Sequence, residues 1–126
     1  DHQVVSLQLE DDVTAVFTMT AFTPGEGRCI RICGTKGEIY ADMEKDLIRF
    51  RPFGQPEEDI DVRKLTTDFS GHGGGDARMV GDLLDLLEGK PMPSGMTTIA
   101  RSVESHVVCL AAEESRLNGG QVVVLK

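Results

Sequence analysis

Apolar and polar residues alternate along the first half of the chain, and this period of two is typical of strands with one buried face. Val5, Leu7 and Leu9 alternate with polar residues, and a second alternating run occupies residues 13–21. Acidic residues at positions 10–12 separate the two runs. The pattern therefore predicts a hairpin at the start of the chain.

More alternating segments follow a Pro-Gly break at residues 24–27. They predict short strands at residues 28–33, 38–43, 47–51 and 59–62. Glycine-rich or charged turns separate them, and glycine readily takes the positive φ values that tight hairpins need. The sequence thus predicts a meander of antiparallel strands.

The hydrophobic period becomes that of a helix after residue 75. Apolar residues then recur with the i, i+3, i+4 spacing of an amphipathic helix, at Met79, Val80, Leu83, Leu84 and Leu87. Asp76 is the predicted N-cap, because a carboxylate accepts from free helix amides and favours the positive end of the helix dipole. Gly89 and Pro91 are expected to end this helix.

A second helix is predicted to begin near Thr97 or Thr98 and to end before the Asn-Gly-Gly of residues 118–120. Residues 121–125 are expected to form a last strand. Together these elements predict the α+β class, as an open, mainly antiparallel sheet with two helices packed on one face.

The two faces of the predicted sheet differ in character. Ile30 and Ile32 are expected on the face that meets the helices, so Cys29, Arg31 and Cys33 point away from them. This second face also includes threonines of the 13–21 strand, and we expect it to be largely Thr, Val and Cys. We interpret it as a contact surface for another protein. The alternative is that threonine is present only because it favours extended backbone.

Composition and charge narrow the choice of partners. The chain has 126 residues, which suits one domain, with 13 Lys and Arg against 21 Asp and Glu and a net charge of −8. This acidity excludes nucleic acid and anionic membrane surfaces, and no apolar run approaches the roughly 20 residues of a spanning helix. Three cysteines without a CxxC pair, and no secretory signal, predict free thiols and a cytoplasmic location.

Residues 70–76, Ser-Gly-His-Gly-Gly-Gly-Asp, are the main candidate for chemistry. Glycines allow the backbone to approach a ligand closely, and the amides of a following helix point into the same space. The imidazole of His72 can donate to or accept from a hydroxyl. We therefore predict substrate binding at His72, Gly73, Gly74 and Gly75, whereas the alternative is a flexible connection that carries His72 on its surface.

Other kinds of site lack a required residue. A P-loop would need a lysine after its last glycine, where Asp76 stands, and no Gly-x-Ser-x-Gly nucleophile accompanies the glycine run. His2, His72 and His106 belong to different predicted elements, so no metal site is predicted. His106 lies on an apolar stripe and is interpreted as a core residue. No Gly-x-Gly-x-x-Gly follows a strand, so we expect no cofactor-binding residue in this chain.

Four segments of the sequence are informative when taken together. They are Ile-Cys-Gly-Thr-Lys-Gly-Glu-Ile at residues 32–39, Gly-His-Gly-Gly-Gly-Asp at 71–76, and the helical segments 102–106 and 111–116. In their order and spacing they resemble the C-terminal domain of the Gfo/Idh/MocA oxidoreductases. The resemblance runs over essentially the whole chain. It implies that residues 1–126 are a substrate-binding and oligomerisation domain, cut from a protein whose N-terminal Rossmann domain binds NAD or NADP.

The resemblance also implies a function. The parent would be an NAD(P)-dependent dehydrogenase acting on a sugar, polyol or similar substrate, and it would form a homo-oligomer through the open sheet face. Its catalytic residues would precede Asp1, so they are unknown here, and this fragment alone would be inactive. A non-catalytic assembly module and a domain of an NAD-dependent glycosidase are the alternatives. Substrate identity, NAD against NADP, and the oligomeric state stay open.

Overall fold

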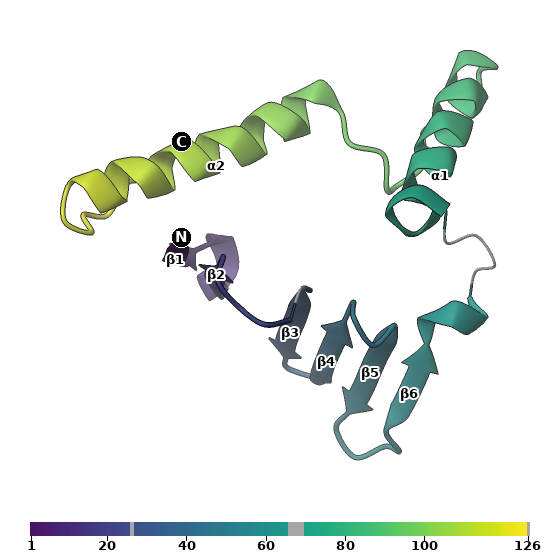
Figure 1. Cartoon of the computed structure of the whole chain (residues 1–126), viewed down its shortest axis with the longest axis horizontal. Helices are drawn as coiled ribbons and strands as arrows, with labels where there is room; N and C mark the ends of the chain where they lie inside the picture. Colours follow the sequence, from purple (N-terminus) through teal and green to yellow (C-terminus); the bar gives the residue numbers. More distant parts are fainter. Residues whose placement is uncertain (26, 66–69, 126) are drawn as a thin grey trace. The chain divides into compact units, whose positions relative to one another are not determined.

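The computed structural model describes residues 1–25, 27–65 and 70–125. Within them lie six strands, two α-helices and two short 3-10 turns (Figure 1). The elements are β1 (His2–Gln8), η1 (Glu10–Asp12), β2 (Thr14–Thr20), β3 (Cys29–Gly34), β4 (Gly37–Asp42), β5 (Leu47–Pro52), β6 (Glu58–Asp61), η2 (Val62–Lys64), α1 (Ser70–Leu87) and α2 (Ile99–Leu117).

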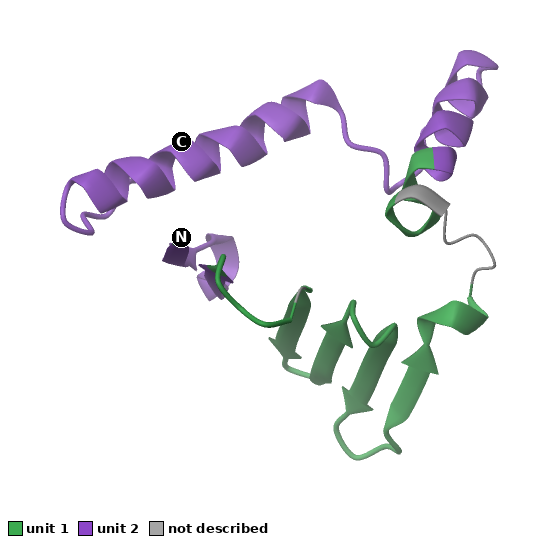
Figure 2. Cartoon of the chain, viewed as in Figure 1, with its two compact units in different colours: residues 1, 20–76 green, residues 2–19, 77–126 purple. Residues whose placement is uncertain are grey.

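The chain divides into two compact units (Figure 2). The first unit contains residue 1 and residues 20–76, and the second contains residues 2–19 and 77–126. The four-stranded meander β3 to β6 belongs to the first unit. The second contains the hairpin β1–β2 except Thr20, most of α1 and all of α2.

The meander of the first unit is antiparallel throughout, in the order β3-β4-β5-β6. Ile32 pairs with Ile39, and Ile39 pairs with Phe50. Gly37 begins β4 with φ 157°, and a Cβ there would lie 2.5 Å from the carbonyl oxygen of Arg51. Glycine is therefore required at this turn because the backbone of β5 approaches too closely for a side chain.

This register separates the meander into an apolar and a charged face, since directly paired residues share a face. The apolar face carries Ile30, Ile32, Ile39, Ala41, Ile48, Phe50 and Ile60, together with Glu58, which is paired with Phe50. The opposite face carries Cys29, Arg31, Cys33, Glu38, Tyr40, Asp42, Leu47, Arg49, Arg51, Asp59 and Asp61. The prediction that this second face is largely Thr, Val and Cys is wrong for the meander, because β4, β5 and β6 contribute mostly charged residues.

The second unit contains the predicted hairpin and the second helix. The amide of Leu9 donates to the carbonyl of Val13 at 2.8 Å and closes the β1–β2 connection around η1. Thr98 is the N-cap of α2, and its hydroxyl accepts from the amide of Arg101 at 3.3 Å. Asn118 is the C-cap. Both ends of α2 therefore lie where the sequence predicts them.

The α+β class is confirmed, with two corrections to the predicted layout. The described strands form one two-stranded and one four-stranded sheet in place of the predicted single sheet. Residues 121–125 form no strand, although the sequence predicts one there; an extended segment becomes a strand only where a neighbouring strand takes up its hydrogen bonds. The packing of both helices on one sheet face stays a prediction.

Apolar side chains are largely uncovered in both units. Among the described residues no hydrophobic side chain is buried, and Ile30 and Ile32 are 56% and 50% exposed. A residue exposed in the whole chain is at least as exposed in its own unit, so the described residues of neither unit enclose an apolar core by themselves. Cys29, Cys33 and Cys109 are free thiols, as predicted. No described helix combines the length and the apolar character that a membrane crossing requires.

Candidate functional site

The glycine-rich segment forms the first turns of α1 and does not precede the helix as predicted. The helix begins at Ser70, six residues before the expected start at Asp76. Its backbone is nevertheless irregular there, because His72, Gly73 and Gly74 have φ values of 46°, 68° and 84°. Right-handed helices need negative φ, so these three residues form a left-handed turn at the start of α1.

The glycines of this turn serve the backbone in different ways. Gly73 and Gly74 take φ values that are costly for residues with a Cβ, and Gly74 is buried. A Cβ at Gly73 would meet nothing within 4 Å, so the space above this residue is open. At Gly75 the nearest neighbour of a Cβ would be the Cβ of His72, at 4.0 Å. Glycine is thus required by conformation at Gly73 and Gly74, and the open space at Gly73 leaves room for a ligand.

His72 and Asp76 form a pair across one turn of this segment. Nδ1 of His72 lies 3.0 Å from both Oδ1 and Oδ2 of Asp76. The imidazole side chain is 87% exposed and the carboxylate 57%. Asp76 lies inside α1, so its predicted role as N-cap is wrong. Because the helix begins earlier, this carboxylate faces the imidazole one turn before it.

The left-handed conformation of His72 is unusual for a residue with a side chain. Left-handed φ values cost a non-glycine residue roughly 1–3 kcal/mol, and surrounding structure must offset that cost. The glycines on either side and the contact with Asp76 are the local features that accompany it. The turn therefore presents an imidazole whose ring is held at one nitrogen and open to solvent.

His106 occupies a different environment from the one predicted. It lies in the middle of α2, and its Nδ1 donates to the backbone carbonyl of Ser102 at 2.7 Å. His106 is exposed in its unit, so that unit does not bury it in a core as predicted. No group of three or more His, Cys, Asp and Glu side chains in the described part of the chain is arranged to hold a metal ion.

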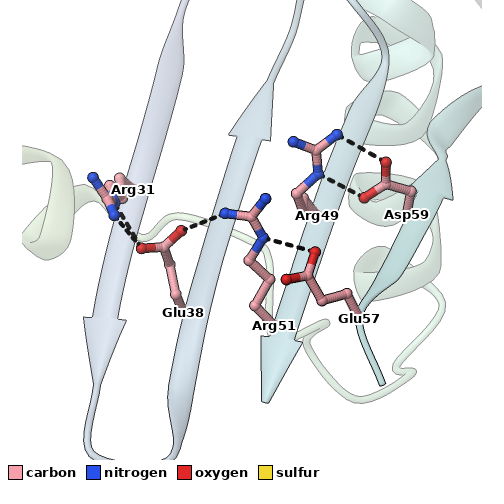
Figure 3. A network of polar contacts seen from close by, with 6 residues as sticks. All are labelled: Arg31, Glu38, Arg49, Arg51, Glu57 and Asp59. Carbon is pink, nitrogen blue, oxygen red and sulfur yellow. Dashed lines mark hydrogen bonds and ion pairs between the residues drawn. The ribbon is translucent and has the colours of Figure 1, made fainter. Parts of the chain in front are cut away.

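A network of ion pairs crosses the charged face of the meander (Figure 3). Glu38 accepts from Nε of Arg31 at 2.8 Å and lies 3.5 Å from Nη1 of Arg51. Arg51 in turn donates through Nε to Glu57 at 3.1 Å. Hydrogen bonding from Arg31 lowers the pKa of the Glu38 carboxyl below its ordinary value. The row therefore links charges from β3 to the segment that enters β6.

A second pair lies on the same face. Arg49 holds Asp59 in a two-point contact, with distances of 2.7 Å and 2.9 Å. Arg31, Arg49 and Arg51 surround Tyr40 and line a shallow hollow of about 280 Å³. Each of these arginines already faces a carboxylate, which gives the face a structural role in joining the strands. Sequence reasoning missed this network, although Arg at i and i+2 of β5 was a visible signal.

The candidate site therefore consists of His72, the glycines Gly73 to Gly75, and Asp76, the last of which was not predicted as a site residue. Comparisons of the chain with protein families, with curated proteins and with solved structures found no match.

Proposed function

We propose that this chain is the substrate-binding and oligomerisation domain of an NAD(P)-dependent oxidoreductase that acts on a sugar, a polyol or a similar compound. The proposal starts from the resemblance of residues 32–39, 71–76 and 102–116 to the Gfo/Idh/MocA family. The observation that supports it is the exposed imidazole of His72 on a left-handed glycine turn. Such a group is suited to hydrogen bonding with a substrate hydroxyl.

The cofactor is assigned to a preceding domain and not to this chain. The sequence has no Gly-x-Gly-x-x-Gly after a strand, and the ladders described for β3 to β6 are antiparallel, whereas dinucleotide folds use parallel strands joined by helices. The residues here do not fit a dinucleotide. In this proposal the chain contributes recognition of the substrate, through His72 and the open space above Gly73.

The test is His72→Ala in the full-length protein, assayed with NAD or NADP against a panel of sugars and polyols. Loss of one substrate hydrogen bond should lower kcat/KM roughly 5- to 100-fold and leave the oligomer intact. His106→Ala is the matched control, since that imidazole bonds to its own helix backbone. Unchanged kcat/KM in the His72 variant would contradict the substrate role.

A second candidate function is a non-catalytic assembly module. The observation that favours it is the absence of any buried hydrophobic side chain among the described residues, which leaves apolar faces of both units open to a partner. The same assay separates the two functions. A stable oligomer of the full-length protein that turns over no sugar or polyol would support assembly and contradict the oxidoreductase.

A further inference from the structure

The contact between His72 and Asp76 constrains the proton on the imidazole. Both carboxylate oxygens lie 3.0 Å from Nδ1. An ionised carboxylate only accepts hydrogen bonds, so Nδ1 must be the nitrogen that donates. A neutral imidazole carries a single N–H. The contact therefore favours the tautomer with the proton on Nδ1 and leaves Nε2 with a free lone pair.

The second ring nitrogen is available to a ligand. Nε2 of His72 makes no hydrogen bond to any residue that the structure describes, and the side chain is 87% exposed. A Cβ at the neighbouring Gly73 would meet no atom within 4 Å, so the space on that side of Gly73 is open. A ligand that approaches this turn therefore meets a hydrogen-bond acceptor at Nε2 and no side chain at the adjacent position.

We infer that Asp76 is a positioning residue for His72, which fixes the Nδ1–H tautomer and so makes Nε2 an acceptor for a ligand hydroxyl. That the ligand is a hydroxyl compound rests on the function proposed above. The tautomer is inferred from the contact between His72 and Asp76 alone. An alcohol can donate to Nε2 in this state, whereas a carbonyl can only accept. The neutral site thus selects the hydroxyl form of a substrate over its carbonyl form.

The test reads the tautomer directly, by two-bond proton–nitrogen correlation spectra of the chain labelled with ¹⁵N. Spectra are recorded at a pH where the imidazole is neutral. The wild-type chain should show His72 mainly as the Nδ1–H form. Asp76→Ala should move it mainly to the Nε2–H form, and Asp76→Glu, which keeps a carboxylate one turn away, should restore the wild-type pattern.

Asp82→Ala is the matched control, because it removes another acidic side chain of α1 and should leave the His72 signals unchanged. Wild-type spectra dominated by Nε2–H would overturn the inference, as would an Asp76→Ala spectrum identical to wild type. The wild-type measurement decides even where a variant fails to fold. If wild-type His72 is in the Nδ1–H form but the full-length His72→Ala variant retains full turnover, the inferred tautomer is supported and the proposed function is contradicted.

Discussion

Asp59 shows how single residues hold the charged face of the meander together. Its carboxylate accepts two hydrogen bonds from Arg49, and these hold its pKa below the ordinary value of 3.8. A carboxyl whose pKa is lowered by folding contributes stability above its unfolded pKa and loses it as pH falls through the folded value. The melting temperature should therefore fall as pH is lowered from about 4 towards 2.

Asp59→Asn should weaken this acid sensitivity, since the substituted side chain no longer ionises. The measurement is the melting temperature by circular dichroism at pH 7, 4 and 3. Glu58→Gln is the matched control, because Glu58 adjoins Asp59 on β6 but is paired with Phe50 and not with an arginine. Equal acid sensitivity in wild type and Asp59→Asn would show that the Arg49 contact does not contribute.

Gly37 is the position where a single methyl group should be most costly to the meander. A Cβ there would lie 2.5 Å from the carbonyl oxygen of Arg51 and 2.8 Å from Cα of Pro52, and backbone atoms of a paired strand move little. Gly37→Ala should lower the free energy of unfolding by about 1–3 kcal/mol, measured by urea denaturation.

Gly34→Ala in the same turn is the control for Gly37. Its added Cβ would lie 3.6 Å from the carbonyl oxygen of Gly37, an ordinary contact distance. The expected change is within about 0.5–1 kcal/mol, the usual cost or gain of exchanging glycine and alanine. If Gly37→Ala and Gly34→Ala lose similar amounts of unfolding free energy, the backbone of β5 does not approach Gly37 as closely in solution.

At the scale of elements, α2 depends on its N-cap. The hydroxyl of Thr98 accepts from the amide of Arg101, which would otherwise have no partner within the helix. Thr98→Ala should cost about 1 kcal/mol and lower the helical signal in circular dichroism. Thr97→Ala changes the neighbouring exposed threonine and should leave that signal unchanged. Loss of helix in both variants would contradict a capping role specific to Thr98.

Hydrophobic period was sufficient to predict most elements. Two local signals predicted their elements correctly. The alternation of Ile30 and Ile32 predicted β3, and the Thr98 cap followed by an apolar stripe predicted α2. The strands are paired in a way that period does not determine. The hydrophobic period could not show that the described strands are grouped into two sheets, β1–β2 and β3 to β6, since pairing depends on residues distant in sequence.

The candidate site was predictable in composition but not in geometry. The glycines around His72 were visible in the sequence, yet glycine permits both signs of φ, so pattern alone could not predict a left-handed turn. Asp76 was expected to cap a helix because its residue type favours that position. Its contact with Nδ1 of His72 depends on where α1 begins, which is decided by backbone conformation over residues 70–75.

The apolar face of the meander is exposed in the first unit, and the stability of the whole molecule depends on what covers this face. Ordering each residue costs backbone entropy, and burial of apolar surface is the main term that offsets it. The first unit alone buries no hydrophobic side chain in its described residues, with Ile32 half exposed. We therefore expect this face to be covered in the folded protein, by the helices or by another subunit.

Ile32→Asp tests that expectation, because a carboxylate on a covered face would have to be buried. It should lower the free energy of unfolding by roughly 3 kcal/mol or more, from the lost transfer energy of the side chain and the cost of burying a charge. Cys33→Ser changes the opposite, charged face and should alter it by less than about 1 kcal/mol. Urea denaturation measures both. If Ile32→Asp is as stable as wild type, this face meets solvent, and the predicted layer of helices on the sheet is wrong.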